Sequence, residues 1–442
     1  MLRDIEKELE KWKNDPDRTP LIVRGARQIG KSYTIEKFGK EYFDSVCLID
    51  LELNSELINC FDSLNPKEII SLLELKLNQE IIPGKSLLFI DEIQTSPNAL
   101  KSLRYFKEKL PDLHVIAAGS LLEFSLDDES FSFPVGRVQF MYMKPFSFTE
   151  FLRANKYDKW IEVLNTISIT NPLNPTLHED LLNLITRFFI IGGMPKVIDS
   201  YLKNKSLLKC SRLQEAIITA YLEDFGKYSK ATEHYYLKVL FEKAPEFISK
   251  HVKYAKIDTT TKRPDEVFKK ALNLLTKAGI LHQVFATAGS GLPLRAQKNE
   301  KKFKLLFLDI GLLQSAMGVD ATALSPENLS LINDGALAEQ FVGQEILATQ
   351  DPYLNRKLYF WQRDKPSSSA EVDYLFGYHG KVVPIEVKAG KTGRLRSIQQ
   401  FISEKKTSIG IRICEKPLSL EKNILTVPFY MIHQIPRLLK EL

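Results

Sequence analysis

A glycine-rich segment near the N-terminus constrains the fold of this chain more than any other feature. A mostly apolar run, residues 21–24, leads directly into Gly-x-x-x-x-Gly-Lys-Ser at residues 25–32, a full match to the P-loop pattern. A strand, a tight glycine turn and a helix would point backbone N–H groups and the positive end of the helix at a phosphate. The segment therefore predicts a phosphate-binding loop, the alternative being a glycine turn before an ordinary helix.

The residue types in this loop suit a nucleotide bound with magnesium. We expect Lys31 to reach the β- and γ-phosphates of ATP and the Ser32 hydroxyl to ligate Mg²⁺. The predicted nucleotide-binding residues are Gly25, Ala26, Arg27, Gln28, Ile29, Gly30, Lys31, Ser32 and Tyr33.

A second apolar run, residues 85–90, ends in two carboxylates, Asp91 and Glu92. On its own such a strand end is common, but about 60 residues after a P-loop it supports the nucleotide site. We expect Asp91 to hold Mg²⁺, through water or through Ser32, and Glu92 to polarise the attacking water. Gln94 is either a sensor of the γ-phosphate or water, or structural.

A third apolar run, residues 114–118, leads to Ser120. Ligands bind at the carboxyl ends of strands in parallel α/β sheets, so Ser120 is a candidate sensor of the γ-phosphate or water, or a plain turn residue. Alternating strands and helices over residues 1–150 indicate an α/β fold with a doubly wound parallel sheet.

These motifs resemble those of bacterial and archaeal AAA-type P-loop ATPases with a C-terminal DUF4143 domain. The resemblance rests on Gly-Ala-Arg-Gln-Ile-Gly-Lys-Ser, Phe-Ile-Asp-Glu-Ile-Gln, Ala-Gly-Ser, and residues 133–138 followed by 144–151. It implies an arginine-finger or sensor role for Arg137, which could equally be a loop Arg paired with a carboxylate. It also implies a helical lid in which Pro195 contacts adenine, although Gly-Gly-Met-Pro at 192–195 also suits a helix end.

The middle of the chain is predicted to contain a helix at 146–160 and, later, helices followed by a hairpin at 280–285 and 302–309. This is the order of a winged helix. Residues 233–309 contain 15 Lys or Arg and 8 Asp or Glu, an excess of +7. Such a domain is a candidate reader of a DNA backbone, but a solvated charged face or a protein-contact surface would look the same.

The C-terminal part begins with an expected amphipathic helix carrying Glu339. A later strand carries Asp373, and its hairpin partner carries Glu386 and Lys388 on one face. This pattern resembles metal nucleases of the PD-(D/E)xK class. The resemblance implies that Asp373, Glu386 and, in addition, Glu339 bind a second Mg²⁺ or Mn²⁺, with Lys388 stabilising developing charge.

The composition restricts the class of protein further. The 442 residues suggest about three domains, and 44% hydrophobic with 26% charged residues is typical of a soluble globular protein. No run approaches a membrane span, and the charged N-terminus is not a signal peptide. Four widely spaced cysteines form neither a zinc pattern nor a disulfide framework, so we expect a cytoplasmic protein with no membrane partner.

We therefore predict a P-loop ATPase domain at 1–150, a helical lid at 151–232, a winged-helix domain at 233–330 and a restriction-endonuclease-like α/β domain at 331–442. The predicted function is a Mg²⁺-dependent ATPase that couples nucleotide state to a DNA-binding, nuclease-like domain. Two alternatives stay open: a regulatory switch that binds DNA or a protein without cutting, and an interaction scaffold. Because an arginine finger acts between subunits, a homo-oligomer is a further candidate partner.

Overall fold

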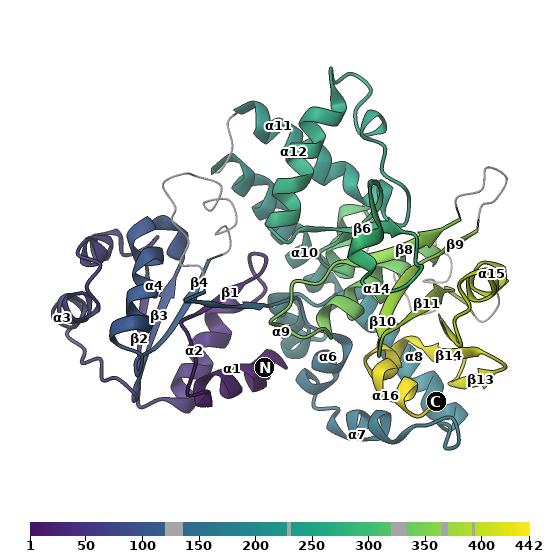
Figure 1. Ribbon diagram of the computed structural model, residues 1–442, viewed down its shortest axis with the longest axis horizontal. Coiled ribbons are helices and arrows are strands. Elements are labelled where there is room, and N and C mark those ends of the chain that lie inside the picture. The colour runs from purple at the N-terminus through teal and green to yellow at the C-terminus, as the bar shows by residue number, and fades with distance from the viewer. Residues whose placement is uncertain (120–135, 228–230, 320–333, 364–369, 391–393) are drawn as a thin grey trace. The chain divides into compact units, whose positions relative to one another are not determined.

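The computed structural model describes the chain except for residues 120–135, 228–230, 320–333, 364–369 and 391–393. The described residues divide into two compact units (Figure 1). The first unit contains residues 1–144, 277–279 and 351–355, and the second contains residues 145–276, 280–350 and 356–442.

The first unit is built on a five-stranded parallel sheet with the order β2-β3-β4-β1-β5. Its strands are β1 (Leu21–Arg24), β2 (Ser45–Asp50), β3 (Ser86–Asp91), β4 (His114–Ala118) and β5 (Gln139–Tyr142). Its helices are α1 (Ile5–Asn14), α2 (Lys31–Tyr42), α3 (Pro66–Leu77) and α4 (Pro97–Lys109), with shorter helical turns at Ser55–Phe61 and Ile93–Thr95. Every residue of β3 and β4 is buried, as expected when helices cover a parallel sheet. The predicted parallel P-loop sheet is confirmed.

Two glycines shape the loop between β1 and α2. Gly25 has φ +148°, and a Cβ at this position would lie 2.5 Å from the carbonyl oxygen of Met143. Gly30 has φ +88° and is the N-cap of α2. A side chain is disfavoured at both positions, by the close approach at Gly25 and by the backbone conformation at each.

The second unit combines helices with two sheets. Its helices are α6 (Phe148–Ala154), α7 (Asp158–Thr166), α8 (Pro175–Ile191), α9 (Pro195–Asn204), α10 (Leu207–Asp224), α11 (Ala231–Lys243), α12 (Pro264–Lys277), α13 (Ile310–Ala316), α14 (Asp334–Ala348), α15 (Arg396–Lys405) and α16 (Ile435–Lys440). Its strands are β6 (Leu281–Thr287), β7 (Lys298–Phe307), β8 (Leu358–Gln362), β9 (Glu371–Val372), β10 (Tyr374–Tyr378), β11 (Lys381–Val387), β12 (Gly410–Cys414), β13 (Ser419–Glu421) and β14 (Ile424–Pro428).

The two sheets of this unit meet at one residue. The four-stranded sheet has the order β7-β6-β8-β9, and the five-stranded sheet has the order β10-β11-β12-β14-β13. Asp373 is the single residue between β9 and β10, where the chain leaves one sheet and enters the other. The expected antiparallel hairpin β6-β7 forms, but β6 also pairs in parallel with β8. One sheet therefore contains strands from both sides of residue 330, the predicted boundary between the winged-helix domain and the C-terminal domain.

The structure corrects two expected helices. The single helix predicted at 146–160 is two helices, α6 and α7, because Ser147 and Glu150 form a capping box at the start of α6 and Lys156 has φ +61° after its end. Helix α14 was expected to be amphipathic, yet residues 337–347 are all buried. Among the described residues, no single helix is long and apolar enough to cross a membrane, although α8 and α9, bent by 119°, pass that test as a pair.

Asp309 follows the apolar end of β7, and its carboxylate is buried. Asp309 Oδ2 accepts a hydrogen bond from Gly193 N at 2.5 Å, and Oδ1 accepts from Gly311 N and Leu312 N. Gln344 of α14 donates to the same carboxylate. Asp309 thus connects the turn between α8 and α9 with the start of α13 and with α14.

We predict that Asp309→Ala lowers the free energy of unfolding by at least about 3 kcal/mol, because several buried N–H groups lose their acceptor. Urea denaturation of the full chain measures the change. The control is Asp265→Ala, an exposed aspartate in the first turn of α12, which should change stability by less than about 1 kcal/mol. Equal midpoints for Asp309→Ala and wild type would contradict this role.

Candidate functional sites

The first candidate site lies at the carboxyl ends of β1 and β3 in the first unit. The Ser32 hydroxyl at the start of α2 donates a hydrogen bond to Asp91 Oδ2 at the end of β3. Strand β4 lies between β1 and β3 and runs parallel to both. The carboxyl ends of all three strands therefore lie at this edge of the sheet. Ser120 follows β4 but lies outside the described residues.

Lys31 is buried within this site, and none of the described carboxylates forms an ion pair with its ammonium. Its ammonium donates to the carbonyl oxygens of Gly25 at 3.0 Å and Ala26 at 2.9 Å. Burial lowers the pKa of Lys31 to about 8, although the charges of Glu92 and Asp91 act in the opposite direction. A buried cation held only by neutral carbonyls is suited to accept an anion such as a phosphate.

The two carboxylates of the site are held differently. Burial raises the pKa of Asp91, and the hydrogen bond from Ser32 opposes that shift. Glu92 has φ +49°, an uncommon conformation for a residue other than glycine. Gln94 Nε2 donates to Glu92 Oε2 at 2.5 Å, so the amide that we considered as a sensor contacts the predicted water-activating carboxylate directly.

The donor atoms of this site fit magnesium. A serine hydroxyl and an aspartate carboxylate are the hard oxygen ligands that Mg²⁺ prefers, together with water and phosphate oxygens. Ser32 and Asp91 are already within hydrogen-bond distance of each other. The side chains of these two residues would hold the ion.

The remaining predicted nucleotide residues have different surroundings. Tyr33 is 61% exposed, and Arg27 lies 3.6 Å from Glu52. Arg137 Nε donates to Glu108 at 3.1 Å, which is the loop ion pair that we considered as the alternative to a finger or sensor. Pro195 begins α9 in the second unit, and its contact with adenine stays a prediction.

The second candidate site is an acidic cluster in the second unit. Glu339 comes from α14, Asp373 from the junction of β9 and β10, and Glu386 from β11. Asp373 Oδ2 accepts from Val387 N at 2.7 Å, which places Asp373 across the hairpin as expected. Lys388 Nζ lies 2.8 Å from Glu386 Oε1.

Three residues that we did not predict complete this cluster. Lys304 of β7 lies 2.9 Å from Glu339 and 2.6 Å from Glu371 of β9, and 4.0 Å from Asp373. His251 Nε2 lies 2.8 Å from the other oxygen of Glu371. The sequence signal was a lysine inside the apolar end of β7, since lysine is rarely buried without a partner.

The charges of the cluster are strongly perturbed. Burial raises the pKa of Glu339 to about 7 and that of Asp373 to about 6, against the opposing charge of Lys304. Burial also raises the pKa of Glu386. Burial lowers the pKa of Lys304, but the carboxylates of Glu339, Asp373 and Glu371 more than offset this effect, and the net shift is upward.

The predicted second metal does not fit this cluster. Among the residues that the structure describes, no group of three or more His, Cys, Asp or Glu side chains could hold a metal ion. The ammonium of Lys304 already contacts the carboxylate of Glu339, which we had expected to serve as an additional metal ligand.

The parallel sheet and its glycine loop define the first unit as a P-loop ATPase domain. Residues 17–152 match the family model described as AAA domain, residues 182–323 match Domain of unknown function (DUF8612), and residues 334–432 match Domain of unknown function (DUF4143). These matches confirm that the chain combines an AAA-type ATPase domain with a C-terminal DUF4143 domain.

Three solved structures show partial similarity to this chain. A Walker-type ATPase of Pyrococcus abyssi is 17% identical, with a TM-score of 0.46, over 72% of this chain and 96% of that one. The Orc1 protein of Aeropyrum pernix in complex with DNA is 10% identical, with a TM-score of 0.32, over 73% and 94%. The RuvB branch migration motor of Thermotoga maritima is 14% identical, with a TM-score of 0.29, over 64% and 89%. The comparison with curated proteins found no match.

We predict that Lys31→Met stabilises the nucleotide-free protein at pH 7, by on the order of 1–3 kcal/mol, because the mutant no longer buries an ammonium. The pKa of Lys31 is about 8 in the fold, against an ordinary value of 10.5 for lysine. The free-energy cost of burying the Lys31 ammonium is therefore complete below pH 8 and disappears as the pH rises to 10.5. Urea unfolding at pH 7 and pH 10 should show the gain at pH 7 and little at pH 10.

The control for this experiment is Lys40→Met, an exposed lysine of the same helix. Its effect on stability should not change between the two pH values in this way. A Lys31→Met gain that is the same at both pH values would contradict the burial argument.

Proposed function

We propose that this protein is a Mg²⁺-dependent ATP hydrolase whose nucleotide state controls a nuclease-like, DNA-binding second unit. The observation that carries the first part is the hydrogen bond between Ser32 and Asp91. It joins the loop that would bind phosphate to the strand that would hold the metal ion. Lys31, the first residue of α2, and Glu92, which directly follows β3, belong to the same site.

Each of these residues has a distinct role in the proposed hydrolysis. Lys31 exchanges its carbonyl partners for the β- and γ-phosphate oxygens, and the N–H groups of the loop bind the remaining oxygens. Ser32 and Asp91 would hold Mg²⁺, which would neutralise charge on the phosphates. Glu92 orients the attacking water and accepts its proton. Gln94 fixes the Glu92 carboxylate until nucleotide and water arrive.

Glu92→Gln should lower kcat for ATP hydrolysis by about 10²–10⁴, because an amide cannot accept the proton, while ATP affinity changes little. Phosphate release measures turnover, and equilibrium dialysis with labelled ATP measures binding. Lys31→Ala should lose both. Glu68→Gln, at an exposed position of α3, is the control, and unchanged turnover in both site variants would reject this site.

The proposal for the second unit rests on its element order and its acids. From α14 through β8, β9 with β10, β11, α15 and β12, the order is helix, three strands, helix, strand, with β10-β11 antiparallel and β11-β12 parallel. Asp373, Glu386 and Lys388 converge on one side of this hairpin. A cutting enzyme of the PD-(D/E)xK class would use such a set to act on a phosphodiester.

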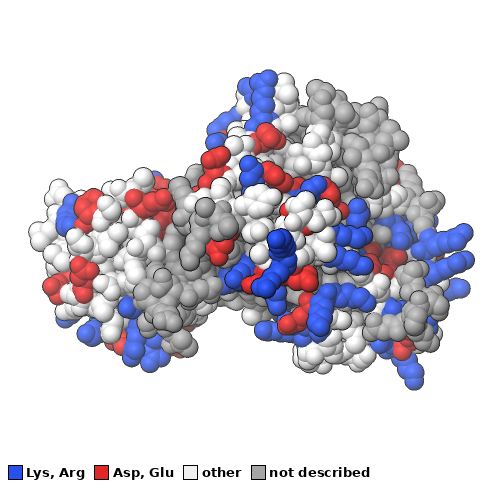
Figure 2. All heavy atoms as spheres, turned by 90° about the horizontal axis from the view of Figure 1, so that it is seen from above, with Lys and Arg blue, Asp and Glu red and all other residues white. Residues whose placement is uncertain are grey.

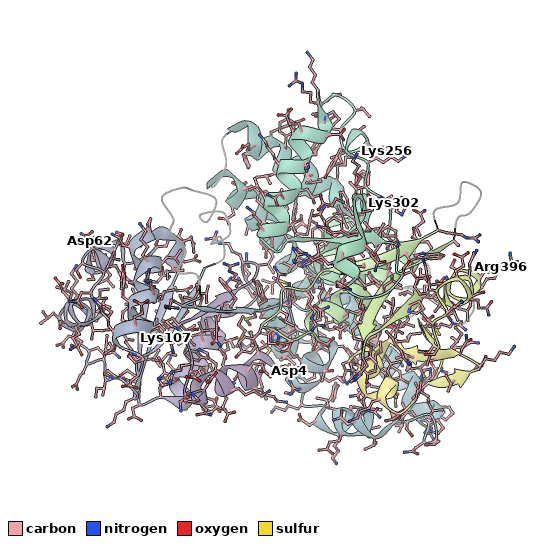
Figure 3. The ribbon with its side chains drawn as sticks, in the orientation of Figure 1. Asp4, Asp62, Lys107, Lys256, Lys302 and Arg396 are labelled. Carbon is pink, nitrogen blue, oxygen red and sulfur yellow. The ribbon has the colours of Figure 1, made fainter. Side chains whose placement is uncertain are left out.

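Exposed basic side chains support binding to a DNA backbone. Figure 2 shows Lys and Arg side chains on the face of the second unit that is in view, and Figure 3 labels Lys256, Lys302 and Arg396 on this unit. Lys256 and Arg396 are exposed, as is Arg394 just before α15. Such cations release counterions when they contact phosphates, which gives affinity without sequence preference.

A second candidate function is a nucleotide-controlled switch that binds DNA or a protein partner without cutting. The observation that favours it is Lys304, which lies within 2.9 Å of two of the acids. The two candidates share the ATPase and the DNA contact and differ in chemistry at the cluster. In either case Arg137 would complete a neighbouring nucleotide site only in a homo-oligomer.

We expect the double variant Arg394→Ala/Arg396→Ala to bind DNA more weakly and to reduce the slope of log K against log salt by about 1–2. Fluorescence anisotropy on a labelled duplex measures both. The charge-matched control is Lys67→Ala/Lys85→Ala, two exposed lysines of the first unit, which should bind like wild type. A slope equal to that of wild type would place the DNA contact elsewhere.

A cleavage assay on supercoiled and linear DNA, with Mg²⁺ or Mn²⁺ and with or without ATP, separates the two candidates. Cleavage that Glu386→Ala abolishes would support the nuclease, and its loss in Lys31→Ala would show control by nucleotide. Intact DNA with ATP still hydrolysed would support the switch.

A further inference from the structure

Lys304 is a charged residue in an unusual position. It is 2% exposed and lies near the end of β7, among the buried residues 303–307. Its ammonium lies 5.1 Å from the centre of the Phe360 ring of β8. Burial of an ammonium costs several kcal/mol unless anions compensate, so its surroundings must supply negative charge.

The compensating anions come from separate elements of the second unit. Lys304 Nζ is 2.9 Å from Glu339 Oε1 of α14 and 2.6 Å from Glu371 Oε1 of β9. Asp373 Oδ1 is 4.0 Å away. One ammonium group therefore lies close to three carboxylates. They belong to a helix, a strand and a strand junction, and they span 34 residues of sequence.

Each of the other acids of the cluster also has a partner for at least one oxygen, although Glu386 Oε2 is buried without a hydrogen-bond partner among the described residues. The second oxygen of Glu371 contacts His251, Asp373 Oδ2 accepts from Val387 N, and Glu386 Oε1 contacts Lys388. Each of the four acids thus has a hydrogen-bond or ion-pair partner within the second unit. The cluster does not need an added cation to give its members a partner.

The distances leave no room for a divalent ion that bridges Glu339 and Glu371. Mg²⁺ binds carboxylate oxygens at about 2.0–2.1 Å and demands near-octahedral geometry. An ion bridging Glu339 and Glu371 would occupy the space that the Lys304 ammonium fills at 2.6–2.9 Å from the same two oxygens. The lysine and the metal ion are therefore alternatives.

We propose that Lys304 is an internal cation that takes the place of a divalent metal ion in the acidic cluster, so that the second unit holds its nuclease-like acids together without metal. The ammonium supplies one fixed positive charge and hydrogen bonds, but it has no open coordination positions for a water or a phosphate oxygen. Glu339 and Glu371 are then partners of Lys304. The inference goes beyond the ATPase activity and stands whether or not the P-loop hydrolyses ATP.

The test measures Mn²⁺ binding to the full chain without nucleotide. The electron paramagnetic resonance signal of free Mn²⁺ reports how much of the ion is unbound. All proteins carry Asp91→Asn, which removes the metal position of the P-loop. With Lys304 present, we expect no binding that depends on the cluster. In Lys304→Ala the carboxylates lose their cation, and affinity for Mn²⁺ should tighten by at least about tenfold, with a thermal midpoint that rises on addition of Mn²⁺.

Two controls locate the effect. Lys301→Ala removes an exposed lysine of the same strand and should not bind Mn²⁺ more tightly. Adding Asp373→Asn to Lys304→Ala should weaken the acquired binding. Binding by the protein with Lys304 intact that Asp373→Asn abolishes would overturn the proposal, as would a folded Lys304→Ala that gains no affinity.

If Lys304→Ala does not fold, the titration of the protein with Lys304 intact still decides. Absence of cluster-dependent Mn²⁺ binding there supports the internal cation, and its presence refutes it. ATP turnover, measured separately in chains with Asp91 intact, is unaffected by either result. Failure of this inference is therefore distinguishable from failure of the proposed hydrolase.

Discussion

The buried polar side chains of α14 fix the geometry on which the second unit depends. Gln340 accepts a hydrogen bond from Phe307 N and donates to Phe307 O, so it pairs with the backbone as a neighbouring strand would. One turn later, Gln344 accepts from Ile310 N and donates to Asp309. These side chains hold the end of β7 and the start of α13 against one helix.

This constraint also explains how the acidic cluster is assembled. Lys304 precedes Phe307 by three residues on β7, and Glu339 precedes Gln340 by one residue on α14. When Gln340 pairs with the Phe307 backbone, the lysine and the glutamate face each other at 2.9 Å. A buried ion pair of this kind adds little net stability by itself, but breaking it leaves an uncompensated charge, so it restricts how β7 and α14 can pack.

The sequence was informative where the chemistry is local. The P-loop spacing and the apolar strands before Lys31 and Asp91 predicted the parallel sheet of the first unit, because glycine conformation and strand burial act over a few residues. It was wrong about α14. The pattern predicted an amphipathic helix, whereas the polar residues at 339, 340, 344 and 345 are buried as fully as their apolar neighbours. Their partners lie on segments distant in sequence, such as Phe148 N for Glu345. The periodicity of a sequence cannot show whether the polar face of a helix contacts solvent or buried polar groups.

The same limit applies to charge. Lys304 contributed to the basic excess of residues 233–309, although its charge is internal and unavailable to DNA. Two buried lysines among the described residues, Lys31 and Lys304, are in opposite states. Lys31 is held by neutral carbonyls, and burial lowers its pKa, so an arriving phosphate would relieve an existing cost. Lys304 is held by carboxylates that raise its pKa on balance, so an arriving anion would have to displace them. One lysine is therefore poised to bind a ligand, while the other already has its ligand in the protein.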